Sequence, residues 1–296
     1  MKNRRELAII LAVVMTLSLH LSMVTVDAQV LEPTASGVNV RRNDKAEIDY
    51  SNARYGYVMV RFMERTTSSV RVLITGPSNV QYQYRLNTDG RWEVFPLSDG
   101  NGQYSIGVFE QVSGNRFATA NSININVALV DEFAPFLRPN QFVNFNRNSR
   151  VVSLATELTR GSTSVIDTVS RVYNYVIENI EYDFELARTV TSGYVPDIDR
   201  VLQRGKGICF DYAAVMTAML RSQGIPTKLV IGYAGDVFHA WISVHSPETG
   251  WINNIIQFDG RTWQLMDPTF AATANQSAEA MRFIGDGTNH NPTHFH

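Results

Sequence analysis

The chain has one cysteine, Cys209, and its surroundings suit a reactive thiol. Gly205-Lys206-Gly207-Ile208 precedes it, and a run rich in Ala, Met and Leu follows as far as Gln223, which predicts a helix beginning at the cysteine. The positive end of a helix dipole and the unpaired N–H groups of a first helical turn stabilise a thiolate. We therefore interpret Cys209 as a nucleophile; the alternative is a buried, inert small hydrophobe.

A thiolate nucleophile needs a base and a group that orients the base, and His239 and Asp267 are the candidates. Residues 239–245 alternate between two faces, one of them apolar, so His239 is expected to begin a strand. Asp267 follows a second predicted strand, residues 261–266, which comes after the Asp259-Gly260 turn signal. Adjoining antiparallel strands lie about 4.8 Å apart, which would let the carboxylate contact the imidazole. The alternatives are a hydrogen-bonded core histidine and a turn-capping aspartate.

Three motifs around these residues resemble those of the transglutaminase-like superfamily. The nucleophile motif is GICFDYA at residues 207–213, the histidine motif is HAW at 239–241, and the aspartate motif is WQLMDPT at 263–269. Residues 224–233 also resemble the segment that follows the nucleophile in that family. The resemblance covers about residues 150–275, and its specificity comes from the order of the motifs and their predicted helix or strand context.

This resemblance implies a papain-like core in which Cys209 is the nucleophile, His239 the base and acid, and Asp267 the orienting carboxylate. Members of the family include protein cross-linking transglutaminases, peptidases, amidases and proteins that have lost activity. The chain departs from the family in the long segment between His239 and Asp267. Its extra length, at residues 246–256, predicts a loop or an added strand beside the site. The family's oxyanion-hole residue upstream of the cysteine is not identified by the sequence.

Other residues near the motifs are interpreted as structural. Asp211 is expected in the first helical turn, but a carboxylate beside a thiolate would oppose ionisation of the thiol, so we do not assign it to catalysis. Tyr212 is expected to pack. Trp241 and Trp263 are expected to form core or cleft wall, and Tyr194 could line the cleft.

A zinc site is an alternative use of a cysteine, a histidine and an aspartate. The glycines before Cys209 and its place at a helix start favour a nucleophile over a zinc ligand, so we expect no metal and no cofactor. Three further histidines, His290, His294 and His296, lie in the tail. We expect a mobile polar terminus there rather than a metal site.

The preceding part of the chain predicts an all-β domain. Between residues 46 and 130, short alternating segments are separated by turn signals, among them Asn87-Thr88-Asp89-Gly90, which is typical of a hairpin. This pattern predicts an immunoglobulin-like β-sandwich at residues 29–135, beginning with an irregular polar arm. Residues 131–150, with two prolines and several asparagines, are expected to form the border with a catalytic domain at 150–296.

The catalytic domain begins with helical spacing and continues with strands. One helical face is formed by Val165, Val169, Val172, Val176 and Ile180, with Ser162 and Thr163 as candidate N-caps. Residues 197–203 predict a short helix, and residues 228–233 predict a strand after the cysteine helix. Helices followed by a mainly antiparallel sheet indicate an α+β fold, preceded by the β-sandwich.

The N-terminus has the three parts of a secretory signal peptide. Lys2, Arg4 and Arg5 precede an apolar run at residues 7–19, and Ala28 ends a segment that suits cleavage. We expect residues 1–28 to be removed and the mature chain to be secreted or extracellular; the alternative is an uncleaved membrane anchor. Export would expose the unpaired thiol of Cys209 to oxidation. The presence of this thiol is explained if Cys209 is required for catalysis.

The function predicted from the sequence is a secreted, thiol-dependent enzyme that attacks amide carbonyls of a protein or peptide, with cell-wall peptides among the candidate substrates. Hydrolysis and transamidation share the first half-reaction, so the sequence does not choose between them. The alternative is a catalytically silent cell-surface or wall-binding protein with the same fold. A formal net charge of −2, from 26 basic and 28 acidic residues, gives no reason to expect nucleic acid as a partner. Oligomeric state is left open.

Overall fold

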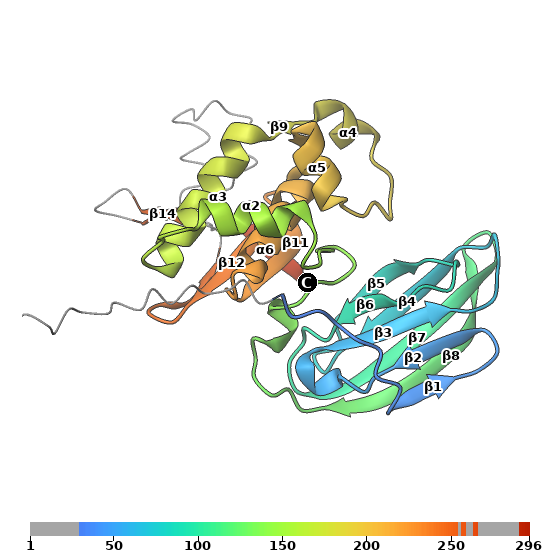
Figure 1. Ribbon diagram of the computed structural model, residues 1–296. Helices are drawn as coiled ribbons and strands as arrows, with labels where there is room; N and C mark the ends of the chain where they lie inside the picture. The colour runs from blue at the N-terminus through green and yellow to red at the C-terminus, as the bar shows by residue number, and fades with distance from the viewer. Residues whose placement is uncertain (1–29, 254–255, 259–262, 266–289) are drawn as a thin grey trace, which may run out of the picture.

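The computed structural model describes residues 30–253, 256–258, 263–265 and 290–296 (Figure 1). The predicted signal peptide, residues 1–28, and the predicted orienting residue Asp267 lie outside the described residues. Within the described residues, no helix has the length and apolar character needed to cross a membrane.

Two four-stranded antiparallel sheets form the N-terminal part of the molecule. The first has the order β1 (Val40–Arg42), β2 (Ala46–Asp49), β3 (Tyr57–Phe62) and β6 (Glu93–Pro96). The second has the order β5 (Gln81–Leu86), β4 (Val70–Thr75), β7 (Gly102–Ser113) and β8 (Arg116–Val127). The sheets share one hydrophobic core, and the alternation in β4 and β5 directs every second side chain into it. We call this part the β-domain; its immunoglobulin-like classification and the domain boundaries stay predictions.

The turn signal at residues 87–90 does not make a hairpin. Asn87 and Asp89 do form the turn, because each side chain accepts a backbone N–H two residues further on. However, β5 pairs with β4 and β6 pairs with β3, so the turn carries the chain from one sheet to the other. Turn residues reverse the chain locally but do not determine which strands pair.

The predicted irregular arm is also partly ordered into the sheet. β1 pairs with β2, and the residues before it are held by side chains of the folded protein. Glu32 forms an ion pair with Arg147, and the N–H of Thr34 donates to the hydroxyl of Tyr57. The arm therefore contacts both the β-domain and the segment that leads out of it.

The C-terminal part combines five helices of the described chain with a four-stranded antiparallel sheet. The helices are α2 (Arg150–Leu158), α3 (Val165–Asn179), α4 (Phe184–Thr189), α5 (Ile198–Arg204) and α6 (Cys209–Ser222). The sheet has the order β13 (Gly250–Asn253), β12 (Val237–Ser246), β11 (Thr227–Ala234) and β16 (His290–Phe295). Two short ladders pair β9 (Glu181–Tyr182) with β10 (Lys206–Gly207) and β14 (Ile256–Phe258) with β15 (Trp263–Leu265). Short 3₁₀ turns, η1 (Ala53–Tyr55) and η2 (Ala134–Phe136), complete the fold.

The predicted α+β order of helices before an antiparallel sheet is confirmed, with small differences at the ends of elements. The helix predicted from Val165 is α3, but its N-cap is Ser164, whose side chain accepts the N–H of Asp167, and not Ser162 or Thr163. The predicted helix at residues 197–203 is α5, with Asp197 as its N-cap. The predicted cysteine helix is α6, and it begins at Cys209.

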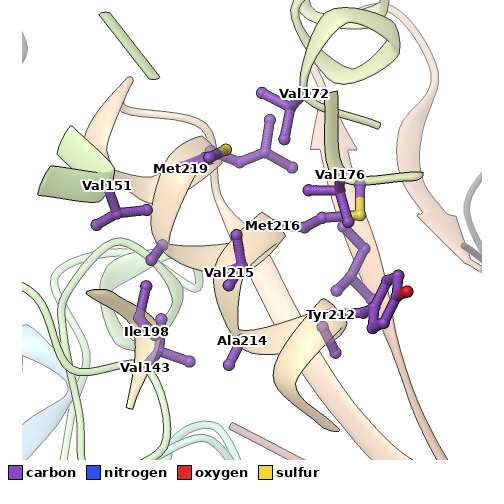
Figure 2. Packing of buried hydrophobic residues seen from close by; sticks show 14 of the residues in the cluster. Val143, Val151, Val172, Val176, Ile198, Tyr212, Ala214, Val215, Met216 and Met219 are labelled. Atoms are coloured by element: carbon purple, nitrogen blue, oxygen red, sulfur yellow. The ribbon is translucent and has the colours of Figure 1, made fainter. Parts of the chain in front are cut away.

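α6 is the central element of this part. It is apolar on nearly every side and almost wholly buried, which is typical of a helix enclosed by protein. Figure 2 shows Val215, Met216 and Met219 of α6 beside valines of α2 and α3. The sheet covers the opposite side, where Ile242 of β12 joins the same core. A helix enclosed in this way gives its first residue a fixed position.

The tail is not a mobile polar terminus. Residues 290–295 form β16, which pairs with β11, and His296 is buried against the β-domain. Nδ1 of His296 lies 3.0 Å from the hydroxyl of Tyr84, and Oγ of Ser98 donates to the carbonyl of Phe295 at 2.6 Å. Burial lowers the pKa of His296 well below its ordinary value, with the nearby charges of His294 and Arg221 adding to the effect. We refer to β16 and His296 as the C-terminal tie, because they join the β-domain to the helical part (Figure 1).

Candidate active site

The chain turns sharply before it enters α6. α5 ends at Arg204 and is capped by Gly205, which has a left-handed φ of 62°. β10 then pairs with β9, and Ile208 leads into α6. Cys209 is the first residue of α6 and is half-buried. The N–H groups of a first helical turn have no acceptor within their own helix, so they surround the start of α6 with donors. The thiol therefore lies where a negative charge is favoured.

Asp211 stabilises this turn from inside the protein. Its side chain is fully buried, Oδ2 accepts the N–H of Ile208 at 2.9 Å, and Oδ1 accepts the hydroxyl of Tyr194 at 2.8 Å. Burial raises the pKa of Asp211, although both hydrogen bonds act in the opposite direction. A Cβ at Gly207 would lie 2.7 Å from Cβ of Asp211, so the glycine makes room for the carboxyl. These contacts support the structural interpretation of Asp211.

His239 lies on β12, opposite Gly232 of β11, and is 4% exposed. Its ring stacks on that of Trp241, with centroids 6.1 Å apart and planes inclined by 24°. Trp241 is 3% exposed, as expected for a residue of the core or the cleft wall. Gly232 is required here because a side chain would collide with the ring of Trp241, 2.8 Å away, and with the backbone of Asn291 in β16.

Cys209 and His239 line the same cleft, which has a volume of about 820 Å³. α6 also packs directly against β12, the strand that carries His239. Tyr194 lines the cleft as well, so the expectation for that residue is confirmed. Two of the three residues predicted to form the site therefore contribute to one cavity.

The strand that leads to Asp267 is not adjacent to the strand of His239. β15 pairs with β14, whereas β12 pairs with β11 and β13, so the expected pairing of these two strands is wrong for the described residues. The physical reason is the extra segment after Ser246, because it supplies β13 and takes the position next to β12. The contact between Asp267 and His239 stays a prediction.

The sequence predicts that the extra segment forms either a loop or an added strand beside the site. It forms an added strand, β13, but this strand does not lie beside the site. Trp251 of β13 packs against Phe133 and Phe136, and the ammonium group of Lys228 lies 3.8 Å from its ring centroid. No residue of β13 lines the cleft. The described part of the segment therefore stabilises the border between the two parts of the molecule.

No pattern in the sequence predicts that the β-domain contributes to the cleft. Three side chains of its second sheet, Arg71, Gln83 and Arg85, line the cleft opposite the core that carries Cys209. The loop at residues 190–195 lines it as well. Alternation shows that these three residues leave the sheet on its outer face, but it does not show what that face meets. Among the described residues, no group of three or more His, Cys, Asp or Glu side chains is arranged to hold a metal ion.

Residues 152–268 match the family model of the transglutaminase-like superfamily, and this stretch includes Cys209, His239 and Asp267. The uncharacterized protein YebA of Bacillus subtilis is 30% identical over 123 residues, which cover 35% of this chain and 17% of that protein. A protein-glutamine gamma-glutamyltransferase of Pseudomonas aeruginosa is 32% identical over 69 residues, covering 19% of this chain and 10% of that protein. The chain thus spans less than a fifth of either relative.

Solved structures show weaker similarity. A structure from Cytophaga hutchinsonii, described as a candidate cysteine protease, has a TM-score of 0.40 and 14% identity, covering 88% of this chain and 74% of that one. Red sea bream transglutaminase has a TM-score of 0.32 and 14% identity, covering 79% of this chain and 54% of that one.

Proposed function

We propose that the transglutaminase-like core at residues 152–268 makes this chain a thiol-dependent enzyme in which Cys209 attacks amide carbonyls. The observation that carries the proposal is that Cys209, at the start of a buried helix, and His239, on the strand packed against it, line one cleft. The cleft volume of about 820 Å³ is in the range of small-molecule and peptide sites.

The proposed first half-reaction begins with transfer of the thiol proton of Cys209 to His239. The sulfur then forms a bond to the carbonyl carbon, and the carbonyl electrons move to the oxygen. The N–H groups at the start of α6 would stabilise this oxyanion. When the carbon–nitrogen bond breaks, His239 returns its proton to the leaving amine and a thioester to Cys209 remains. Asp267 is proposed to orient the imidazole and stabilise its charged form.

Water or a second amine would complete the reaction. We favour water, because no aspartate or glutamate is among the described residues that line the cleft. A carboxylate there would be expected if the cleft bound the ammonium group of a lysine as the acceptor. The proposed activity is therefore hydrolysis of a peptide or amide.

The test is turnover of a peptide library by the wild-type chain and by Cys209→Ala, with mass spectrometry of the products in the presence of an isotope-labelled amine. Cleaved peptides with the wild type and none with the variant support the proposal. Equal product from both proteins contradicts it. Efficient incorporation of the labelled amine would replace hydrolysis by transamidation.

The competing function is a binding protein with an inert thiol. Alkylation by iodoacetamide separates the two functions without knowledge of the substrate. We expect Cys209 to react at neutral pH faster than a model thiol, because the helix start favours the thiolate. Labelling at the rate of a model thiol would favour the binding protein.

We further propose that the chain acts after export, on peptides of the cell surface or wall, because of the signal-peptide pattern at residues 1–28. N-terminal sequencing of the protein recovered from the culture medium or cell surface tests this. A mature terminus just after Ala28 is expected, and retention of the whole chain inside the cell would contradict export.

A further inference from the structure

Arg71 of β4 and Arg85 of β5 are directly opposite each other in the second sheet of the β-domain. Like charges in this position repel and destabilise a strand pair, so the two arginines carry a cost to the stability of the sheet. Both line the cleft that contains Cys209 and His239. Neither forms a salt bridge with a described acidic residue.

Two acidic side chains near the arginines, Glu93 of β6 and Glu110 of β7, already have other partners. Glu93 accepts hydrogen bonds from the backbone of Asn87 and from the amide of Gln141. Glu110 forms an ion pair with Lys45 at 2.5 Å. The described residues that line the cleft include no aspartate or glutamate. Two arginines therefore line the cleft without a salt bridge to a described acidic residue.

Arg71 is held by an aromatic ring, and Arg85 lies next to a loop of the cleft. The guanidinium carbon of Arg71 lies 4.1 Å from the ring centroid of Phe117, a cation–π contact that fixes the group without neutralising it. Cδ of Arg85 lies 3.9 Å from the position that a Cβ at Gly193 would take. The residue after Gly193, Tyr194, donates its hydroxyl to Asp211 in the first turn of α6. Arg85 is thus next to the loop that is bonded to the start of the cysteine helix.

We infer that Arg71 and Arg85 form a carboxylate-binding wall, so that the enzyme prefers peptides with a carboxylate near the amide that Cys209 attacks. Guanidinium groups bind carboxylates through paired N–H donors, so each of the two arginines can offer donors to a carboxylate in the cleft. The carboxylate could belong to a glutamate or aspartate side chain or to a free peptide C-terminus. This inference rests on the proposed function, since it assigns the specificity of the same cleft.

Affinity labelling of Cys209 in the full chain tests the inference without a known substrate. The probes are iodoacetyl-(Gly)n-Glu-amide with one to three glycines, the neutral isosteres iodoacetyl-(Gly)n-Gln-amide, and iodoacetyl-(Gly)n-Gln with a free C-terminus. Rates are measured for the wild type, the double variant Arg71→Gln/Arg85→Gln, and the control Arg41→Gln. Arg41 lies on β1 and does not line the cleft, so the control removes a charge of the same kind elsewhere.

We expect the best anionic probe to label the wild type roughly fivefold faster than its neutral isostere, as for an accessible ion pair. This ratio should fall to near one in the double variant, stay unchanged in Arg41→Gln, and shrink at high salt because exposed charges are screened. Faster labelling by the glutamate probe than by the C-terminal acid identifies a side-chain carboxylate, and the reverse order identifies a chain end.

Two results would contradict this inference and leave the proposed function intact. One is equal labelling of the wild type by anionic and neutral probes, and the other is an unchanged ratio of anionic to neutral labelling rates in the double variant. Plain iodoacetamide provides the internal reference for the thiol. If iodoacetamide labels Cys209 no faster than a model thiol, the proposed nucleophile fails, and the specificity inference fails with it. Thermal unfolding of each variant verifies that the β-domain is folded.

Discussion

The two walls of the cleft are built in different ways. On one wall, Cys209 and His239 belong to a helix and a strand that are enclosed in a hydrophobic core. On the other wall, Arg71 and Arg85 extend from the outer face of a sheet, and Arg85 is exposed to solvent. A buried framework fixes the position of reacting groups, whereas exposed charges can vary without disturbing the core. Substitutions on the first wall should therefore change the rate or the stability, and those on the second should change selectivity.

The largest contrast is expected within α6 itself. Cys209→Ala should reduce turnover by at least about 10³-fold, as loss of a nucleophile does, with little change in stability because the residue is half-buried. Met216→Ala, in the fully buried middle of the same helix, should lower the free energy of unfolding by about 2–5 kcal/mol. Turnover assays and urea unfolding of both variants test this. A strongly destabilised Cys209→Ala would show that the start of α6 is part of the core.

A buried arginine of α6, Arg221, stabilises the junction between the β-domain and the helical part. Arg221 is 1% exposed and donates to the carbonyls of Thr227, Arg138 and His296. Its burial lowers its pKa to about 9. Arg221→Met should lower the free energy of unfolding by about 3 kcal/mol, because three carbonyls lose their donor. Urea unfolding measures this, with the exposed Arg160→Met as the control; equal stability of the two variants would contradict a structural role.

The C-terminal tie should make the junction sensitive to acid. The folded protein holds His296 neutral, with its pKa below the ordinary value of about 6.5, so the unfolded chain binds a proton more readily. Stability is therefore unaffected by this group above about pH 6.5 and falls as the pH drops below that value. The raised pKa of Asp211 has the opposite effect on stability. It lowers the stability of the folded protein as the pH rises above the ordinary pKa of an aspartate.

Calorimetry of the wild type and His296→Gln between about pH 5 and 8 measures this dependence. The variant should be less stable at neutral pH, because the ring contacts Tyr84 and Phe142, and its melting temperature should depend less on pH in the acidic range. His245→Gln is the control, because His245 is a partly buried histidine of β12 outside the C-terminal tie. Parallel pH curves for the wild type and His296→Gln would exclude His296 as the titrating group.

The smallest effect is expected on the second wall. Arg85→Gln removes the repulsion between the facing arginines and should raise the free energy of unfolding by a few tenths of a kcal/mol. Urea unfolding compared with Arg41→Gln measures the difference. A loss of stability in Arg85→Gln would mean that the arginine supports the fold.

The parts of the fold that could be predicted depend on local patterns. α6 follows from an Ala, Met and Leu run that ends before Gly224, and β4 from the alternation of Val70, Val72 and Ile74. Local patterns could not identify β16, because it has few apolar residues and is a strand only through its pairing with β11. Likewise, local motifs predicted Cys209 and His239 as site residues, but no local pattern predicted the arginines across the cleft. Their proximity depends on how the two parts of the molecule pack.

β16 also has a consequence for solubility. Leu229, Val230 and Ile231 make β11 an apolar strand, and without β16 its backbone N–H and C=O groups would be open to other chains. Such an open strand edge is a template for aggregation. β16 replaces it with a polar edge that carries Pro292, which has no N–H to donate to an incoming strand. Damage to residues 290–296 by proteolysis should therefore appear first as loss of soluble protein.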